Sequence, residues 1–382
     1  MKRLLVLALL ALIPTPSAAL ADGCPLPCSG RTASPEGVKL LFVQPSGPDG
    51  PLVVYDTASR APAFSLPSGR ASADGLGYFT AVARARTTRL VHYYAPTGER
   101  IESWSVPGRW KLQGVSPSGR WLALVRRNGR LTFVWIFDAG RGKLAHQLRL
   151  AGTFEVETIS RDGKRLFLIE HLAGRRYSVR QYDLSRERLV VHPLRAAGVK
   201  IMAGYAWSGV GSPDGKWLLT LYLSTARNTA FVHSLDLRRS RPACIELPSG
   251  SGSFELLKRY SLTLAPNGET LYAANPALGV VAELDLYASR VKRTTRFARS
   301  VAGSADRVAA LSTISRNGRT LYYSSGRDLR AYDAAYSRVR GPYRTHGRVI
   351  GVGYGADDRH IYVVRKDGQM LAFNAATGRR AT

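Results

Sequence analysis

The sequence predicts an all-β fold, a single β-propeller with eight blades favoured over seven and mostly four antiparallel strands in each blade. Three observations carry this prediction. A turn followed by an apolar, β-favouring run recurs eight times along the chain. A second motif, an apolar strand that ends in a polar turn, follows each of these turns by roughly twenty residues. No segment shows the 3.6-residue apolar period of an amphipathic helix.

The first motif is a tight turn between two strands, as in SPSGRWLALVR from Ser116 and SPDGKWLLTLY from Ser212. Pro presets φ for the first corner, and Gly accepts the positive φ that a reversal needs. The runs that follow are rich in Leu, Tyr, Phe, Val and Trp, which suit half-buried strands. The repeat turns are marked by Gly37, Gly75, Gly119, Gly163, Gly215, Gly268 and Gly318, with Asp358 in the eighth place.

The second motif is an apolar strand that usually ends in Asp, as in RQYDLSRE and HSLDLRRS. A carboxylate at this position can accept hydrogen bonds from the backbone amides of the next turn. That structural role explains the repeated acid without any catalysis. The strand ends are Asp56, Asp138, Asp183, Asp236, Asp285 and Asp333, with Ala95 and Asn374 in the two deviating copies.

Two motifs in a period of roughly 44 residues leave room for about four strands, which is typical of a propeller blade. The propeller is expected to span residues 34–382. Eight copies predict eight blades, whereas seven require one copy to be shared or to lie outside the ring. The first and last copies are short, which favours closure of the ring by N- and C-terminal strands in one blade.

The turn of the SPDGKWLLTLY type, followed by one of the QYDLSRE type, resembles the blades of WD-repeat-like and YVTN-type bacterial β-propellers. It also resembles the Tol-system periplasmic propeller, in its blades only. The Gly-His and Trp-Asp pairs of true WD repeats are missing, as is the separate N-terminal domain of the Tol component. The resemblance implies the fold and leaves function open, because one propeller scaffold hosts many unrelated sites.

The first 21 residues have the pattern of a signal peptide. Lys2 and Arg3 precede an apolar run that ends at Ile13, and an A-x-A site places cleavage before Asp22. The run is too short to cross a bilayer of about 30 Å, and no later stretch is longer, so no transmembrane segment is expected in the mature chain. We expect export to the periplasm or secretion. A lipoprotein anchored through Cys24 is the alternative.

Residues 22–33 form a segment that contains Cys and Pro. Cys24 and Cys28 flank Pro-Leu-Pro, and an exported compartment permits a disulfide between them. The bridge requires a turn or a cis proline, because polyproline II would hold the two Cα atoms about 12 Å apart. Cys244, the third cysteine, is expected to be a buried apolar thiol.

Catalytic motifs are absent from the sequence. No two of the seven histidines lie within five positions of each other, so no zinc-binding spacing exists. No G-x-S-x-G nucleophile elbow is present. We therefore expect no catalytic residue, no metal and no cofactor.

The charge is the remaining functional signal. Lys and Arg total 55 against 27 Asp and Glu, for a formal net charge of +28. The turns after the first and third strands of a blade open on the same face, and each repeat places cations there. Solvation of exposed turns explains part of this pattern. As candidate binding residues we take those around the second motif, namely Arg141, Lys143, Arg186, Arg188, Arg238, Arg239, Arg241, Arg290, Lys292, Arg293, Arg338 and Arg340.

These observations predict an exported, monomeric, non-catalytic binding module. Its partner would be a protein or an anionic envelope component that contacts the basic face. The alternative is a propeller hydrolase or lyase with an axial active site, built from side chains that converge from different blades.

Overall fold

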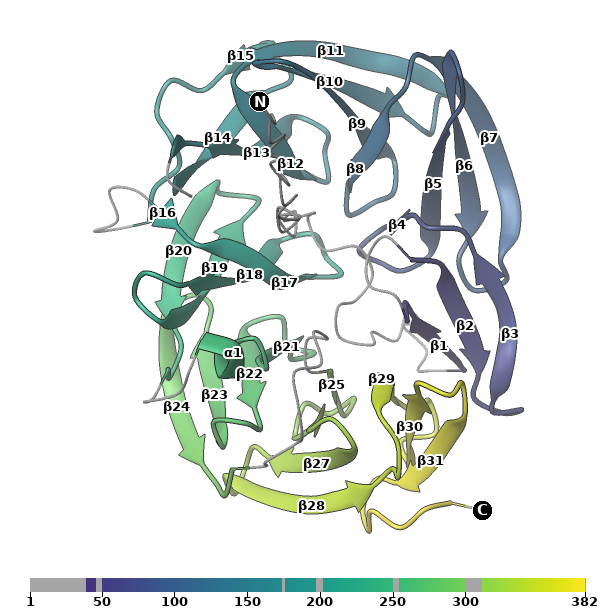
Figure 1. Ribbon diagram of the computed structural model, residues 1–382, viewed down its shortest axis with the longest axis vertical. Coiled ribbons are helices and arrows are strands. Elements are labelled where there is room, and N and C mark those ends of the chain that lie inside the picture. Colours follow the sequence, from purple (N-terminus) through teal and green to yellow (C-terminus); the bar gives the residue numbers. More distant parts are fainter. Residues whose placement is uncertain are drawn as a thin grey trace, which may run out of the picture.

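The computed structural model describes residues 39–45, 50–173, 176–196, 202–249, 254–299 and 311–381. These residues form eight separate antiparallel sheets. The sheets stand around a common centre, and within each sheet the strands follow one another from the centre to the rim (Figure 1). The chain is an eight-bladed β-propeller, as its sequence predicts.

Each complete blade has its strands in chain order, and the last strand lies at the rim. The first three blades contain β1 (Leu40–Val43), β2 (Leu52–Asp56) and β3 (Ala61–Leu66); β4 (Arg70–Ala71), β5 (Gly77–Ala83), β6 (Thr87–Tyr94) and β7 (Glu99–Pro107); and β8 (Lys111–Val115), β9 (Trp121–Asn128), β10 (Leu131–Asp138) and β11 (Lys143–Ala151). The fourth contains β12 (Thr153–Ile159), β13 (Arg165–His171), β14 (Arg176–Asp183), β15 (Arg188–Leu189) and β16 (Met202–Ala203).

The remaining blades follow the same pattern. The fifth and sixth contain β17 (Tyr205–Gly211), β18 (Trp217–Ser224), β19 (Thr229–Asp236) and β20 (Arg241–Glu246), then the short helix α1 (Phe254–Leu257), and β21 (Ser261–Leu264), β22 (Thr270–Asn275), β23 (Val280–Asp285) and β24 (Arg290–Arg296). The seventh and eighth contain β25 (Ser312–Ile314), β26 (Thr320–Ser324), β27 (Asp328–Asp333) and β28 (Arg338–Arg344), and β29 (Val349–Tyr354), β30 (His360–Arg365) and β31 (Met370–Asn374).

The two ends of the chain build separate blades. Strands β1 to β3 form one sheet and β29 to β31 another. The C-terminal residues 379–381 return along β31, where the amide of Ala381 donates to the carbonyl of Ala372 at 2.8 Å. Among the described strands, the expected closure by one shared blade is therefore wrong. The end of the chain instead covers the outer edge of its own blade.

Apolar packing between blades closes the ring. Each interface between neighbouring blades holds a cluster of buried apolar side chains drawn from both. At the closing interface, Leu41 and Val43 of the first blade pack with Val364 of the eighth. A Cβ atom at Gly351 would lie 2.6 Å from a methyl carbon of Val43, so this approach requires glycine.

Both repeated motifs are hydrogen-bonded turns. In the fifth blade, Ser212 Oγ accepts from the amide of Trp217 at 2.8 Å, and Asp214 accepts from the amide of Lys216 at 3.0 Å. At the second motif, Asp236 accepts from the two amides of the turn that follows it, each at 2.9 Å. The predicted structural role of these acids is confirmed. Positive φ, as predicted, occurs at Gly75, Gly119, Gly163, Gly215, Gly268, Gly318 and Asp358.

Several expectations fall outside the described residues. They are the signal peptide at 1–21, the segment at 22–33 with Cys24 and Cys28, and the first repeat turn at Gly37. Cys244 is a free thiol and is only partly buried. In the described part of the chain, no helix has the length and apolarity to cross a membrane.

The repeat glycines differ in what surrounds them, which gives a test of the turn packing. Gly215 has φ +70° and a Cβ there would lie 2.7 Å from the Cβ of Pro117, whereas Gly268 has φ +69° and open space within 4 Å. Gly215→Ala and Gly268→Ala therefore share the backbone strain, and only the first adds a clash. We expect Gly215→Ala to lose about 1 kcal/mol more free energy of unfolding, measured by chemical denaturation. Equal losses would show that Pro117 does not constrain this turn.

Candidate active site

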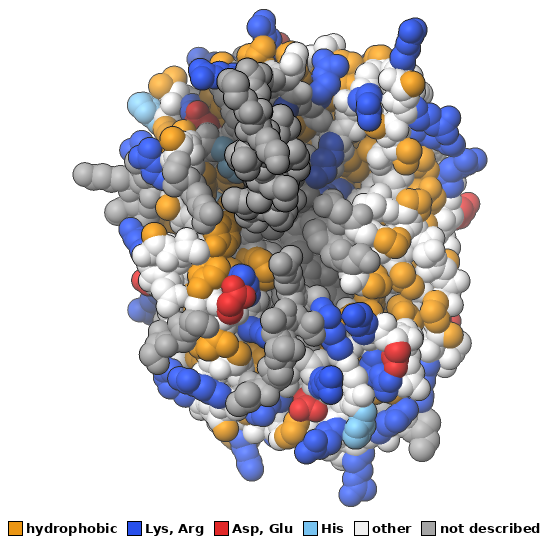
Figure 2. All heavy atoms as spheres, in the orientation of Figure 1, with side chains coloured by type: hydrophobic (Ala, Val, Ile, Leu, Met, Phe, Trp, Pro, Cys, Tyr) orange, Lys and Arg blue, Asp and Glu red, His pale blue; other side chains and the backbone are white. Residues whose placement is uncertain are grey.

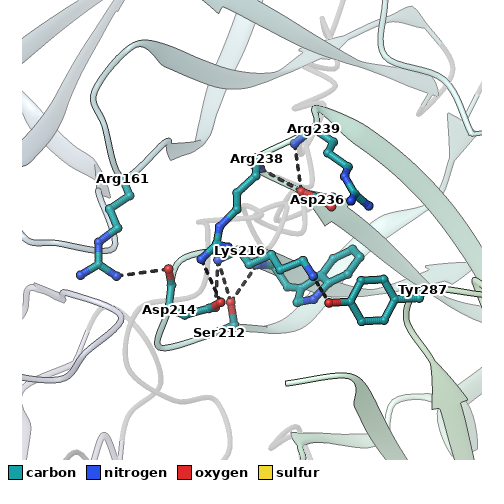
Figure 3. Close-up of polar contacts among 9 residues, drawn as sticks. Arg161, Ser212, Asp214, Lys216, Asp236, Arg238, Arg239 and Tyr287 are labelled. Carbon is teal, nitrogen blue, oxygen red and sulfur yellow. Dashed lines mark hydrogen bonds and ion pairs between the residues drawn. The ribbon is translucent and has the colours of Figure 1, made fainter. Parts of the chain in front are cut away.

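Four of the predicted basic residues, Arg141, Arg186, Arg238 and Arg239, lie on turns, and the other eight lie on the last strands β11, β15, β20, β24 and β28. In Figure 3, Arg161 and Asp214 come from the first turns of the fourth and fifth blades, and Arg238 comes from a second turn. Arg161 donates to the carbonyl oxygen of Asp214 at 3.2 Å. Arg238 forms an ion pair with the carboxylate of Asp214 at 3.2 Å. The two sets of turns thus share a face, as the sequence predicts.

Several of these cations have partners within the protein. Arg141 and Arg186 pair with the acids that end the preceding strands, Asp138 at 3.8 Å and Asp183 at 3.0 Å. Arg293 donates to Glu283 at 2.8 Å, and Arg340 donates to a backbone carbonyl at 2.8 Å. Figure 2 shows Lys and Arg mainly around the periphery of one face, with few acids between them. The geometry gives these cations a role in holding turns, and a ligand for them stays a prediction.

A different set of polar residues lies on the innermost strands. The pairing of β8, β12 and β17 with their neighbours shifts by one residue, at Gln113, Glu157 and Trp207. A β-bulge of this kind re-aims the side chain of the extra residue. Each of the three contacts the next blade: Gln113 accepts from the amide of Val156, Trp207 donates to the carbonyl of Lys258, and Glu157 lies 3.5 Å from the hydroxyl of Thr220.

Glu155 lies two residues before the bulge residue Glu157 in β12 and contacts a histidine and an arginine from neighbouring strands. Its side chain is 2% exposed. His171, the last residue of β13, places Nε2 3.1 Å from one carboxylate oxygen. Arg127 of the third blade donates to the other oxygen at 3.1 Å and to the carbonyl of Phe154 at 3.0 Å. The side chains of His171 and Arg127 are 41% and 36% exposed, so solvent reaches both partners of a buried carboxylate.

The two carboxyl groups of β12 have pKa values displaced in opposite directions. Burial acts to raise the pKa of Glu155, but the hydrogen bonds and charges of His171 and Arg127 outweigh it and lower the pKa. Burial raises the pKa of Glu157 to about 7, and the negative charge of Glu155 adds to the effect. Glu155 therefore stays ionised while Glu157 holds a proton up to neutral pH. In many active sites, two groups whose pKa values are shifted in opposite directions act one as the general acid and the other as the general base.

Sequence reasoning missed this site because its residues belong to three strands of two blades. One signal was available. Glu155 and Glu157 lie five and three residues before Ser160, the first residue of the repeat turn. No other repeat with a described first strand carries an acid at either position. Alignment of the repeats by their turns singles out the fourth blade, although it cannot show that His171 and Arg127 meet there.

No protein-family model matches the sequence, and no curated protein matches it. Solved structures do. The dihydro-heme d1 dehydrogenase NirN in complex with DHE aligns with a TM-score of 0.53 and 17% identity, over 94% of this chain and 76% of that one. The Dos1 propeller aligns with a TM-score of 0.52 and 10% identity, over 85% of each chain. The likeness establishes the fold. A Pseudomonas aeruginosa periplasmic gluconolactonase also matches, with a TM-score of 0.44, 19% identity and coverage of 80% and 94%.

The expected non-catalytic binding module is contradicted. A dehydrogenase stands among the propellers of similar fold, so the fold gives no support to a module without catalysis. The sequence suggested a module because its cations are numerous and it contains no catalytic motif. In the folded protein, several of those cations pair with acids of the turns, as Arg186 does with Asp183 and Arg238 with Asp214, whereas Glu155 and Glu157 lie buried on β12.

The opposed pKa values predict the pH dependence of stability. The pKa of Glu157 rises from 4.5 to about 7 on folding, so the folded chain binds more protons in this window and loses stability as pH rises. Glu157→Gln removes this loss. From pH 4.5 to about pH 8, we expect the free energy of unfolding of the variant to rise relative to wild type by about 3 kcal/mol.

Glu155→Gln provides a control of opposite sign. Its carboxylate has a lowered pKa in the folded chain, so its stabilisation is present above the unfolded pKa and is lost as pH falls. Relative to wild type, this variant should therefore lose stability as pH rises. Denaturation curves at several pH values measure both differences, and groups common to variant and wild type cancel. If the difference in free energy of unfolding between Glu157→Gln and wild type does not change with pH, Glu157 is not a buried acid without a compensating charge.

Proposed function

We propose that this chain is an enzyme of the hydrolase or lyase class, with His171 as its general base at the axial end of the fourth blade. One observation carries the proposal. A half-exposed imidazole is held at 3.1 Å by a carboxylate that is 2% exposed and lies on the innermost strand of the blade. An exposed base oriented by a buried acid is the arrangement that general acid–base catalysis requires.

The geometry assigns separate roles to the two ring nitrogens. Nε2 of His171 lies 3.1 Å from Glu155, so we assign the hydrogen of the neutral ring to this nitrogen. Nδ1 is then the nitrogen that accepts a proton from a substrate or from water. The ionised carboxylate stabilises the imidazolium that forms, because opposite charges within a few ångströms favour the charged state.

Arg127 supplies a positive charge beside the base. Its guanidinium keeps Glu155 ionised and extends to solvent, where a planar donor group suits a carboxylate or a developing oxyanion. A base next to such a cation supports two reactions. It can activate water for attack on an ester or lactone, or it can remove a proton from carbon next to a carboxylate. The first is hydrolysis and the second is elimination.

Glu157 contributes to the site through its protonation state. It keeps its proton near neutral pH, so a second negative charge does not compete with Glu155 for His171 and Arg127. The comparison with NirN supports the proposal to one extent: a dehydrogenase uses a propeller of similar fold. It does not carry that chemistry to this chain, because function in propellers depends on the site and not on the scaffold.

We also propose that the mature chain is an exported monomer that begins at Asp22. The basic start, apolar run and A-x-A site of residues 1–21 support export. Expression with this segment in a bacterial host should yield a secreted or periplasmic chain, and intact-mass analysis should place its first residue at Asp22. A mass that includes residues 1–21 would contradict cleavage, and added lipid mass at Cys24 would favour the lipoprotein alternative.

The catalytic proposal is tested with δ-lactones and acidic polysaccharides as probes. Lactone hydrolysis is followed by base uptake, and elimination by absorbance of the new double bond. We expect wild type to turn over one probe class and His171→Ala to lower kcat/KM by about 100-fold or more, the usual share of a positioned general base. Glu155→Gln should lower the rate while retaining the fold.

The chain offers a matched control. His146 on β11 lies 3.4 Å from Glu187, which is another His–Glu pair, but Glu187 is 72% exposed. His146→Ala removes the same side chain next to the same acid type without a buried carboxylate. We expect it to leave turnover unchanged. Turnover of neither probe class by wild type, or equal rates for His171→Ala and wild type, would overturn the proposal.

A further inference from the structure

Met202 and Cys244 meet between the fourth and fifth blades, and His233 is the cross-strand partner of Cys244. Met202 is in β16 and is paired with Tyr177, and Cys244 is in β20, the rim strand of the next blade. The sulfur atoms of Met202 and Cys244 are 3.7 Å apart. Neither residue is used by the proposed acid–base site. Their neighbourhood holds buried rings, with Tyr177 stacked on Tyr222 at a centroid distance of 4.9 Å.

His233 points to the same place as Cys244. The two are directly opposed partners on β19 and β20. Directly opposed residues of an antiparallel pair extend from the same face of the sheet, with Cβ atoms about 5 Å apart. Thr220 is the partner of His233 on its other side, and its contact with Glu157 shows that this face looks toward the fourth blade. Imidazole, thiol and thioether therefore face one interface.

His233 lacks the partner that a buried imidazole needs. It is 1% exposed, and neither ring nitrogen has a hydrogen-bond partner among the residues that the structure describes. Buried polar atoms in folded proteins nearly always bond to protein, water or an ion. Tyr222 packs against the ring edge-on, with centroids 5.9 Å apart, and supplies no contact to the nitrogens.

The spacing of the two sulfur atoms matches that of two ligands on one ion. With metal–sulfur bonds of about 2.3 Å, two sulfur ligands are about 3.8 Å apart at a tetrahedral angle and about 4.0 Å apart in a planar three-ligand set. We propose that His233, Cys244 and Met202 form a binding site for a soft monovalent metal ion, Cu(I). Thiolate and thioether ligands select Cu(I), and imidazole completes a three-ligand set.

The chemistry of binding is simple and involves no electron transfer. The thiol of Cys244 loses its proton to solvent as the metal–sulfur bond forms, and the copper stays in its reduced state. Cys244 is only partly buried, so the ion enters from the rim of the fifth blade. Within the described ranges no three residues among His, Cys, Asp and Glu are grouped to hold a metal ion, so the thioether of Met202 is required for a third ligand.

Copper titration of the full mature chain tests the site. Cys24→Ser and Cys28→Ser form the background, because these thiols also bind Cu(I). The reduced protein is titrated anaerobically with Cu(I) against a chromogenic chelator, and Zn²⁺ is titrated in parallel. We expect one Cu(I) per chain, with a rise in the melting temperature on binding. Cys244→Ser should abolish this binding, and His233→Phe should weaken it by about 100-fold.

Met202→Leu and Met370→Leu form a matched pair of conservative variants. Both methionines are buried, at 7% and 4% exposure, but Met370 is in the eighth blade. We expect Met202→Leu to weaken Cu(I) binding by about tenfold and Met370→Leu to leave it unchanged. Equal affinity of the Met202→Leu and Met370→Leu proteins, binding that survives Cys244→Ser, or tighter binding of Zn²⁺ than of Cu(I) would overturn the proposal. Copper that binds only when Cys24 and Cys28 are present would overturn it as well.

Discussion

Burial of both faces of every blade is the constraint on which this structure depends. A sheet of four short strands has two apolar faces, and it can bury them only against neighbouring sheets. The repeat therefore needs a closed ring, in which each blade covers the face of the next. At the interface between the first and eighth blades, this packing requires a glycine, because only Gly351 without a Cβ atom leaves room for Val43. The ends of the chain need not pair for the ring to close, since apolar contact between the first and eighth blades is sufficient.

The same constraint explains where the polar residues of the repeats lie. Apolar strands fill the interfaces, so the turns carry the polar groups that satisfy backbone amides. Ser212 and Asp214 hold one turn, and Asp236 holds the next. The acids of these turns attract nearby arginines, as Arg238 pairs with Asp214 and Arg186 with Asp183. Much of what looks like a binding surface in the sequence is thus part of the turn architecture, although surface pairs of this kind contribute little stability individually.

Polar groups in the interior need a different explanation, because burial of a charged or unpartnered group is costly. The fourth blade contains Glu155 and Glu157 on its innermost strand, and the fifth contains His233. The three lie on two neighbouring blades, and Arg70, Asp138 and Glu283 are buried in other blades. The β-bulge at Glu157 in β12 allows a regular blade to hold this buried carboxyl group.

The sequence by itself determined the repeat, the turns and the strand-ending acids, because each depends on neighbours only a few residues away, and the eight copies of the repeat favoured eight blades over seven. Gly215 and Asp236 take their conformation and hydrogen bonds from their own turns, so a local pattern predicts them. The route of ring closure and the polar clusters were decided by the tertiary structure alone. Glu155, His171 and Arg127 are separated by 16 and 28 residues in the chain and meet only because β12 lies against both β13 and the preceding blade. Contacts between blades depend on the geometry of the closed ring, which no local pattern of residues encodes.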